Sequence, residues 1–386
     1  MRLTDCHNFH DFRELARRRL PSPIFNYIDG AADDEVTYRK NTASFEAVDL
    51  VPDVLRGVET IDMSVTVMGQ KLATPFYCSP TALQRLFHYK GEKAVGAAAS
   101  KFGTMFGCSS LGTTSIEELR KAYDTPQAYQ FYFHKDRGLN KAMLARAKDS
   151  GVDVMMLTVD TITGGNRERD LRTGFSIPLK LNLAGALQFV LKPQWGINFA
   201  TKEPFRLPQL EEHVPMGDTT VSVGKYFSEM LDQSMNWDDV ADMVKQWDGQ
   251  FALKGVMSVE DAKRAIDIGC TGIILSNHGG RQLDGSRTPF DQLGEIVDAV
   301  GDQIDVMMDS GVQRGTHVLK ALAMGAKAVG IGRAYLYPLA AAGQEGVERA
   351  LTLLRAEIER DMKLMGVRSI AELSRDKLRT RAALAA

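Results

Sequence analysis

The sequence is poor in cysteine, in net charge and in long apolar runs. Only four cysteines occur among 386 residues. None forms a Cys-x-x-Cys pair, so neither a disulfide framework nor a zinc site is expected, and we interpret them as reduced, packed thiols. The formal net charge is −2, and no block of five or more lysines and arginines occurs. Nothing in the charge pattern therefore indicates nucleic-acid binding.

Membrane spans and a dinucleotide fingerprint are also missing. No stretch reaches about 18 consecutive apolar residues, so no spanning helix is expected. The first 20 residues lack an apolar run and predict a helix rather than a secretory signal. No Gly-x-Gly-x-x-Gly follows an apolar run, which argues against a doubly wound, dinucleotide-binding sheet.

What the sequence does contain is one pattern repeated eight times. A short apolar run is followed by small or polar residues and then by a helix-like stretch. Two of the helix-like stretches begin with capping-box spacing, Ser115 with Glu118 and Ser258 with Asp261. Most spacings match a βα unit, so the pattern predicts a single α/β domain, a (β/α)8 TIM barrel. The apolar runs are residues 75–80, 104–110, 128–133, 153–160, 251–256, 272–277, 305–311 and 328–332.

The remaining residues are expected to surround the barrel. A helical N-terminal segment, 1–74, precedes the barrel at 75–342. Residues 161–250 form an insertion after the fourth strand, and a loop that long predicts a lid or a docking segment. Residues 343–386 are predicted to form a long helix followed by a loose tail.

Polar residues cluster where the predicted strands end. The carboxyl ends of barrel strands meet at one mouth, so a shared site explains these residues better than packing does. They are Thr81, Ser109, Ser110, Gln130, Tyr132, Thr158, Asp160, Lys254, Ser276, His278, Arg281, Asp309, Gly311, Gly332 and Arg333.

The stretch SNHGGRQLDG places a histidine and an arginine in one tight turn after the sixth strand. His278 is a candidate general base with Asp160 as its carboxylate partner, although a turn histidine bonded to backbone is the simpler interpretation of a lone one. Arg281 is suited to hold a carboxylate by two parallel hydrogen bonds. Arg167 is a candidate second carboxylate ligand, and spacing alone does not separate it from Arg169.

Two further features suggest a bound cofactor. Lys254 leaves an apolar strand and fits a Schiff-base nucleophile, a phosphate ligand or a counter-charge for a reduced cofactor. The stretches DSGVQRG and GIGR follow the last two strands, where barrels often bind phosphate.

These motifs resemble the FMN-dependent 2-hydroxy-acid dehydrogenases and oxidases. SNHGGRQLDG is the signature of that family, and its companions stand in the expected order along nearly the whole chain. The resemblance implies a TIM barrel, FMN as cofactor and a small 2-hydroxy acid as substrate. The companion motifs are SPTALQRLFH, QFYFHKDRG, LTVDT, LKGV, DSG and GIGR.

The resemblance also implies roles for individual residues. His278 takes a proton from the substrate and Asp160 supports it, while Arg167 and Arg281 bind the substrate carboxylate. Tyr27 and Tyr132 contact the substrate. Lys254 steadies the reduced flavin. The implied FMN-binding residues are Pro80, Thr81, Ala82, Ser109, Gln130, Thr158, Lys254, Ser276, Asp309, Gly311, Gln313, Gly332 and Arg333.

The sequence departs from the family pattern at two of these places. Gln313 stands where the family usually has arginine, with Arg314 next to it, so phosphate charge is expected to fall on Arg333 or on a shifted Arg314. Leu111 stands where plant-type glycolate oxidases have tryptophan.

The expected activity is therefore oxidation of an L-2-hydroxy acid, with L-lactate favoured, to the 2-oxo acid. His278 would take the hydroxyl proton if the α-hydrogen leaves as hydride, or the α-proton if a carbanion forms. A quinone or cytochrome is the expected electron acceptor. The alternatives are an oxidase or monooxygenase using O2, an FMN isomerase of a phosphorylated substrate, and a non-catalytic flavin-binding barrel.

The apolar stretch at residues 179–199 is expected to dock on the cytoplasmic side of the inner membrane. Its alternative role is to cover the barrel mouth or a subunit contact in a soluble cytoplasmic protein. The expected assembly is a homo-oligomer, a tetramer. No metal site is expected.

Overall fold

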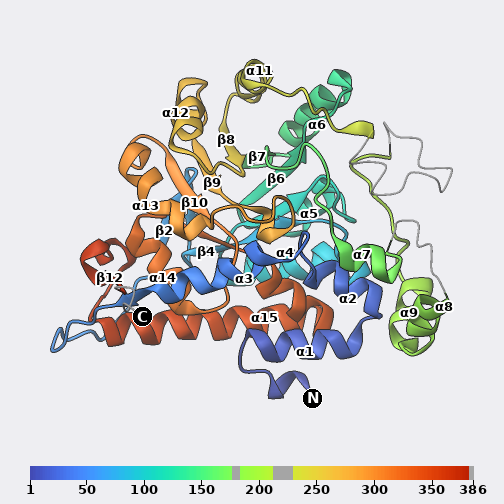
Figure 1. Cartoon of the computed structure of the whole chain (residues 1–386), viewed down its shortest axis with the longest axis horizontal. Coiled ribbons are helices and arrows are strands. Elements are labelled where there is room, and N and C mark those ends of the chain that lie inside the picture. Colours follow the sequence, from blue (N-terminus) through green and yellow to red (C-terminus); the bar gives the residue numbers. More distant parts are fainter. Residues whose placement is uncertain (176–182, 212–228, 382–386) are drawn as a thin grey trace.

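Eight parallel strands form a closed barrel, as the repeated pattern predicts (Figure 1). The computed structural model describes residues 1–175, 183–211 and 229–381. Each barrel strand pairs with the next along the chain, and the last pairs with the first. The strands are β4 (Phe76–Thr81), β5 (Phe106–Ser109), β6 (Gln127–Tyr132), β7 (Val154–Thr158), β8 (Gln250–Lys254), β9 (Gly272–Leu275), β10 (Asp305–Met308) and β11 (Val329–Ile331).

The interior of the barrel is apolar at the end opposite the carboxyl ends of its strands. Alternate residues of a strand face the same side, and one set of them forms a buried cluster inside the barrel. The hairpin of β2 (Val65–Val67) and β3 (Gln70–Leu72) packs its Met68 and Leu72 into this cluster. The hairpin therefore plugs one end of the barrel. The strand residues in the cluster include Tyr77, Ala128, Val154, Met156, Ala252, Ile274 and Met307.

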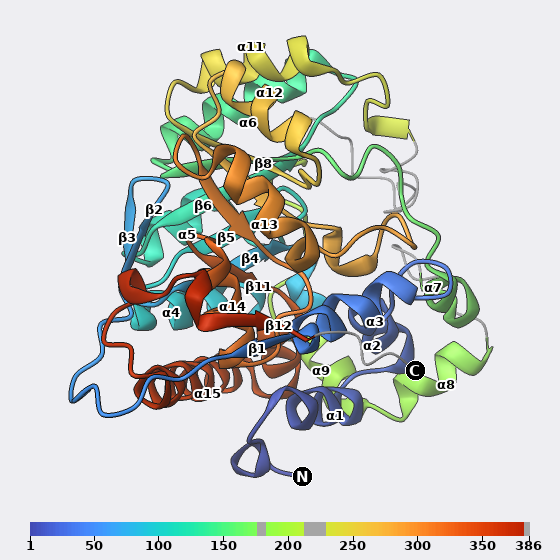
Figure 2. The ribbon, with the colours of Figure 1, turned by 60° about the vertical axis from the view of Figure 1, so that its left-hand side comes forward.

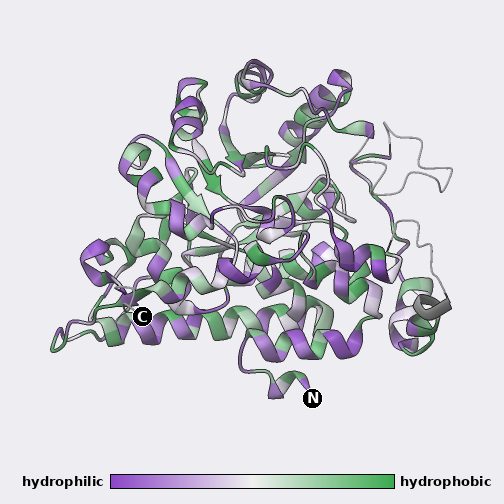
Figure 3. Ribbon diagram, viewed as in Figure 1, coloured by the Kyte–Doolittle hydropathy of each residue, from purple (hydrophilic) through white to green (hydrophobic). Residues whose placement is uncertain are grey.

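Helices cover the outside of the barrel, with their apolar faces inward. In Figure 3, hydrophobic and hydrophilic residues alternate along these outer helices. Both predicted caps are present, since the hydroxyl oxygens of Ser115 and Ser258 accept from the backbone N–H three residues on. The helices between barrel strands are α4 (Gly91–Phe102), α5 (Ile116–Ala122), α6 (Arg137–Asp149), α11 (Trp237–Trp247), α12 (Val259–Asp267), α13 (Pro289–Val300) and α14 (Gly315–Met324).

The C-terminal part differs from the expectation in two ways. The closing helix α15 (Arg333–Met365) begins directly after β11 and is interrupted by non-helical backbone at Ala342 and Gly343. The tail was expected to be loose, but β12 (Leu378–Thr380) pairs antiparallel with β1 (Val48–Leu50), and the prediction is wrong there. These strands are distant in sequence, so local patterns gave no sign of the pairing.

The described residues of the insertion after β7 include the short helices α7 (Glu168–Thr173), α8 (Leu183–Val190) and α9 (Pro193–Thr201), which precede α11. Helix α11 contacts α6 and β8 and so completes the barrel wall. Helices α8 and α9 contact each other and lie at the periphery, beside α7 (Figures 1 and 2). Over the described ranges, no helix is both long enough and apolar enough to cross a bilayer.

The N-terminal segment lies against the mouth of the barrel. Helix α1 (Phe9–Arg19) packs on α15, α2 (Ser22–Asp29) on α7, and α3 (Val36–Ala43) on the turn that holds His278. The carboxylate of Asp284 caps α3 by accepting from the N–H groups of Val36 and Thr37 at 3.2 and 2.7 Å. The start of the chain is thereby tied to the loop after β9.

Asp29, at the end of α2, is the most heavily bonded carboxylate of this segment. It is 1% exposed. Arg13 donates to both of its oxygens at 2.5 and 2.7 Å, Arg169 donates at 2.8 Å, and the Tyr337 hydroxyl donates at 2.7 Å. Burial alone would raise the pKa of Asp29, but the hydrogen bonds from Arg13 and Tyr337 hold it below its ordinary value.

We therefore predict that Asp29→Asn destabilises the protein by about 3 kcal/mol at neutral pH, because it leaves buried donors without their charged acceptor. The pKa of Asp29 is lowered on folding, so this stabilisation is present above the unfolded pKa of about 3.9 and is lost as the pH falls through the folded value.

Urea unfolding of wild type and variant between pH 3 and 7 measures the effect. The two curves should converge at the acid end. Asp49→Asn, which removes the exposed partner of Arg381, is the control and should change the midpoint little. A gap between Asp29→Asn and wild type that stays constant down to pH 3 would contradict the assignment.

Candidate active site

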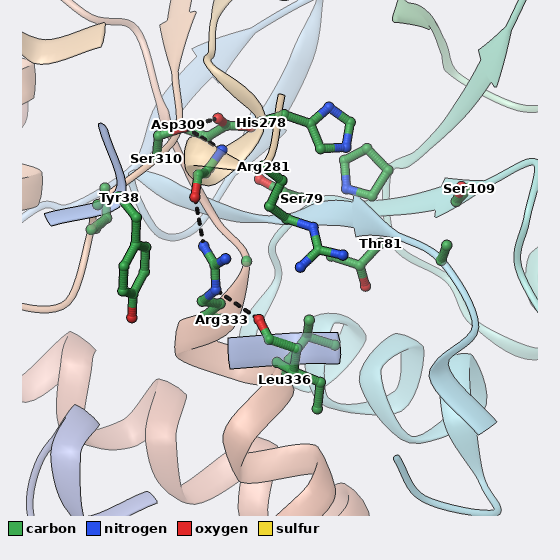
Figure 4. Close-up of a pocket in the computed structure, with 18 of the residues that line it drawn as sticks. Tyr38, Ser79, Thr81, Ser109, His278, Arg281, Asp309, Ser310, Arg333 and Leu336 are labelled. Carbon is green, nitrogen blue, oxygen red and sulfur yellow. Dashed lines mark hydrogen bonds between the residues drawn. The ribbon is translucent and has the colours of Figure 1, made fainter. Parts of the chain in front are cut away.

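One large cavity opens at the carboxyl end of the barrel strands (Figure 4). About 1150 Å³ of space, including open solvent at the mouth, lies within this cavity. The predicted site residues that line it are Tyr27, Pro80, Thr81, Ala82, Ser109, Tyr132, Arg167, Lys254, His278, Arg281, Asp309, Gly311, Gln313, Gly332 and Arg333.

The strand period explains why these polar side chains face inward. Five polar residues that the sequence predicts for the site, two of which line the cavity, lie two residues after members of the apolar cluster inside the barrel, so they share its face nearer the mouth. Gln130 follows Ala128 in this way, and Lys254 follows Ala252. The other three are Thr158, Ser276 and Asp309, which follow Met156, Ile274 and Met307.

Four predicted residues lie behind the wall of the cavity. Asp160 lies behind His278, and Ser276 accepts from Lys254 at 2.8 Å. Gln130 and Thr158 form a buried chain with Ser109, in which the Ser109 hydroxyl donates to Gln130 and the Gln130 amide donates to Thr158, both at 2.8 Å. These residues position the wall.

His278 is held in a strained turn with a carboxylate at one ring nitrogen. Its φ is 57°, a left-handed conformation uncommon outside glycine and found at functional sites. Its Nδ1 lies 3.1 Å from Oδ1 of Asp160 and 3.2 Å from the hydroxyl of Thr161. An ionised carboxylate accepts only, so Nδ1 carries the proton and Nε2 is the nitrogen left for a ligand.

The charge of Asp160 is stabilised by its neighbours. Burial would raise the pKa of this carboxyl group, but the His278 ring, Lys254 and the Thr161 hydroxyl hold it below its ordinary value. The hydroxyl of Thr161 donates to the same oxygen that faces the imidazole, at 2.9 Å. The pair is thus arranged for a neutral imidazole that becomes an imidazolium beside a fixed anion.

The turn itself is supported by the N-terminal segment. Asn277 and Asn41 exchange two amide hydrogen bonds, at 2.9 and 2.6 Å, and both side chains are buried. A Cβ on Gly280, whose φ is +77°, would lie 2.7 Å from the backbone nitrogen of Tyr38. Only glycine therefore allows α3 to approach this closely.

Two arginines converge on the ring of Tyr27. The guanidinium carbon of Arg281 lies 4.9 Å from the ring centroid and that of Arg167 lies 5.6 Å from it. Burial, reinforced by the charge of Arg167, lowers the pKa of Arg281 to about 10, so Arg281 is still charged near neutral pH. Such a pair is expected to attract an anion.

Each arginine uses only some of its guanidinium nitrogens in hydrogen bonds to the described protein. Nη1 of Arg281 donates to the carbonyl oxygens of Tyr27 and Gly30, and Nε of Arg167 donates to Asp170. Within the described part of the chain, the other guanidinium nitrogens of Arg281 and Arg167 have no acceptor. Arg167 lines the cavity and Arg169 does not.

Tyr132 lies in the wall between these groups and Asp160. Burial and then the charge of Asp160 raise the pKa of its hydroxyl, which therefore stays protonated and able to donate a hydrogen bond. Tyr27 is stacked on Phe175 at a ring distance of 4.5 Å, which keeps its ring in place at the mouth.

Lys254 is paired within the barrel. Its ammonium group lies 3.0 Å from Oδ2 of Asp309 and 2.8 Å from the hydroxyl of Ser276, and the side chain is buried. As an ammonium ion paired with a carboxylate, Lys254 lacks the lone pair that a Schiff-base nucleophile needs. This geometry favours a counter-charge for a cofactor over the nucleophile and leaves a buried positive charge at the cavity wall.

The far end of the cavity is formed by the loops after β10 and β11. Gly311, Gln313, Gly332 and Arg333 all line it. A Cβ on Gly332 would meet no atom of the described residues within 4 Å, so open space lies beside this glycine. Backbone N–H groups beside an arginine suit a phosphate.

The expectation of a shifted Arg314 is wrong. Its guanidinium pairs with Glu357 of α15 at 2.7 Å, and the residue does not line the cavity. Gln313 donates to the hydroxyl of Thr42 at 3.1 Å and brings no charge. Arg333 is the charged residue at this end, and it donates to the carbonyl oxygens of Ile28, Gly30 and Gly279.

Several lining residues were missed by the sequence interpretation. Ser310 joins the two ends of the site, because its hydroxyl donates to Asp309 at 2.9 Å and accepts from the N–H of Gly279 at 3.1 Å. Its place beside Asp309 in the DSG motif was the available signal. Figure 4 shows Tyr38 and Ser79 facing the same cavity. Ser79 begins the motif SPTALQRLFH, which was the available signal for it.

The sequence comparisons agree with this geometry. Residues 16–380 match the profile of the family described as FMN-dependent dehydrogenase. The chain belongs to that family. The putative L-lactate dehydrogenase of Mycobacterium tuberculosis is 37% identical, over 97% of this chain and 89% of that protein. The L-lactate oxidase of a Nostoc species is 38% identical, over 95% of this chain and 96% of that oxidase.

Among solved structures, the monotopic membrane protein (S)-mandelate dehydrogenase superimposes with a TM-score of 0.92 at 35% identity, over 98% of this chain and 100% of that one. The expected TIM barrel, the expected FMN cofactor and the expected class, an FMN-dependent L-2-hydroxy-acid dehydrogenase, are confirmed.

We predict that Arg333→Met weakens FMN binding by roughly 10- to 100-fold, the cost of one charge-assisted hydrogen bond. Arg314→Met should bind FMN like wild type, because Arg314 lies outside the cavity. Fluorescence titration of each apoprotein with FMN measures both dissociation constants. Equal losses in the two variants would show that phosphate charge is not concentrated on Arg333.

Proposed function

We propose that this enzyme oxidises L-lactate to pyruvate and passes the electrons to a quinone or cytochrome at the membrane. The observation that carries the proposal is the meeting of three groups in one cavity: a carboxylate-backed imidazole, two arginines with free nitrogens, and a cofactor site with a buried lysine.

The two arginines would hold the substrate carboxylate. Arg281 and Arg167 approach the same aromatic ring and repel each other, and a bound carboxylate removes that repulsion. The hydroxyl of Tyr132 is a donor at the same wall and Tyr27 covers the mouth. Bidentate pairing would fix the substrate's orientation, and with it the carbon presented for oxidation.

Nε2 of His278 would then take the proton. Asp160 fixes the tautomer and stabilises the imidazolium that results. FMN, when bound, supplies the two-electron acceptor that the side chains lack. The ammonium of Lys254 stands ready to offset negative charge on that side of the cavity.

Ala82 and Phe87 line the cavity among the polar groups, which favours a short apolar substituent such as the methyl group of lactate. Relatives named L-lactate dehydrogenase and L-lactate oxidase point the same way. An aromatic 2-hydroxy acid is the second candidate, because the superimposable structure is a mandelate dehydrogenase.

Anaerobic reduction of the flavin by a panel of acids tests the proposal. The panel contains L-lactate, D-lactate, glycolate and (S)-mandelate, followed by O2 or a quinone as oxidant. L-Lactate should bleach the flavin fastest, and the quinone should reoxidise it faster than O2 does. Faster reduction by (S)-mandelate than by L-lactate would contradict the proposed substrate. Faster reoxidation by O2 than by the quinone would contradict the proposed acceptor.

We predict that His278→Ala retains FMN but reduces it about 10²–10⁴-fold more slowly, the usual cost of removing a positioned base. Arg281→Lys should also be slow, because a point charge does not replace a two-pronged guanidinium. Stopped-flow absorbance of the flavin measures both rates. If the flavin of His278→Ala is reduced at the wild-type rate, the histidine has a structural role and is not the base.

We also propose that α8 and α9 attach the enzyme to the membrane surface. Leu187, Val190, Leu191 and Ile197 are each more than half exposed. We call these four residues the apolar patch. A patch of this kind beside basic residues is typical of interfacial helices.

The patch differs from what residues 179–199 led us to expect. Trp195 does not point to the headgroups: its indole N–H donates to the carbonyl oxygen of Leu86 at 2.7 Å and anchors α9. Lys192 donates to the carbonyl oxygen of Arg18 at 2.6 Å, and Lys180 lies outside the described residues. Positive charge near the patch comes instead from the exposed end of α1, Arg17 to Arg19.

We predict that the enzyme cosediments with vesicles of anionic phospholipid at low salt and is released as salt rises. The triple variant Val190→Ser, Leu191→Ser, Ile197→Ser should lose binding and keep its activity. Val54→Ser with Leu55→Ser removes two equally exposed apolar side chains elsewhere and should bind as wild type does. Equal binding by all three proteins would contradict the proposal. The proposed tetramer is tested separately by light scattering.

A further inference from the structure

The lid segment, residues 165–173, carries two arginines in the motif GGNRERD, and they have different surroundings. Arg167 lines the cavity beside Arg281. Arg169 contacts the opposite side, where it donates to Asp29 at 2.8 Å and forms a second ion pair with Glu35. One turn of chain therefore faces both the ligand and the N-terminal segment.

Other contacts join the lid segment to residues 29–35 of the N-terminal segment. The N–H of Asp33 donates to the carbonyl oxygen of Asn166, and the amide of Asn166 donates to the carboxylate of Asp33, both at 2.9 Å. The side chain of Arg169 also packs close to Gly30. The ion pairs of Arg169 are the charged contacts between the lid segment and the N-terminal segment.

Arg167 must be held near Arg281 against their mutual repulsion. Both guanidinium groups lie at the ring of Tyr27, and the charge of Arg167 lowers the pKa of Arg281, an effect that the charge of Asp170 offsets only in part. The ion pair of Arg167 with Asp170 lies within the lid segment itself, so it moves with the segment and holds nothing in place. Arg169 is bonded to a different part of the chain.

We propose that Arg169 is a positioning residue, whose ion pairs with Asp29 and Glu35 fix the lid segment so that Arg167 stays at the substrate end of the cavity. The inference rests on the proposed function, in which Arg167 binds the substrate carboxylate. Arg169 itself touches neither substrate nor cofactor.

The test compares Arg169→Met with Arg172→Met in the FMN-loaded enzyme. Arg172 lies on the same helix and is exposed, and among the described residues its ion pair is with Glu168, so it is a matched control. Arg169→Met should raise KM for L-lactate roughly 5- to 50-fold and leave kcat within about threefold, because a carboxylate contact made throughout the reaction acts on binding. Arg172→Met should leave both constants unchanged.

A double variant separates positioning from a direct effect of charge. In an Arg167→Met background, adding Arg169→Met should change KM less than about twofold, because the group that Arg169 positions is gone. Independent, multiplying effects would overturn the inference, as would a wild-type KM in Arg169→Met. A fall in FMN content or melting temperature that accounts for the KM change would also overturn it.

Two milder variants test the same role if Arg169→Met folds poorly. Arg169→Lys keeps one ion pair and should give an intermediate KM. Glu35→Gln leaves Arg13 and Asp29 paired and should raise KM less than Arg169→Met does. If wild type does not oxidise a 2-hydroxy acid, the proposed function fails. If wild type does and these variants match it, only the role of Arg169 fails.

Discussion

The buried carboxylate of Asp29 and the backbone around it are the point on which the rest of the site depends. Four residues, Tyr27 to Gly30, accept hydrogen bonds from separate parts of the chain, and a buried acceptor that loses its donor is costly. Helix α2 cannot shift without breaking several of these bonds together. The substrate end and the phosphate end of the cavity thus share one wall. The donors are Arg13, Arg169, Arg281, Arg333 and the hydroxyl of Tyr337.

The barrel supplies the second constraint, through the period of its strands. Residues two apart face the same way, so the apolar plug at one end leads directly to polar side chains at the other. The turn after β9 is strained, because His278 adopts a left-handed conformation there. The amide pair of Asn41 and Asn277 and the close packing at Gly280 hold that turn.

What the sequence could predict follows from the range of each interaction. The eight strands and their polar ends repeat a local pattern, and all eight were found where predicted. The pairing of β1 with β12 and the plug of β2 and β3 join distant or very short strands, which no local period reveals. Spacing likewise could not separate Arg167 from Arg169, or Arg333 from Arg314. Those choices depend on which carboxylate lies opposite, and that is a property of the folded chain.

The arrangement of the arginines also bears on how the site selects an anion. Burying Arg281 beside Arg167 costs free energy in the empty enzyme, which is why the pKa of Arg281 is lowered. A carboxylate reverses that cost when it binds, whereas a neutral analogue leaves two buried charges facing each other. Discrimination then comes from the penalty on the wrong ligand as much as from contacts with the right one. Before substrate binds, the protein must hold Arg167 and Arg281 together despite their repulsion. The hydrogen bonds and ion pairs to residues 27–35 provide that hold.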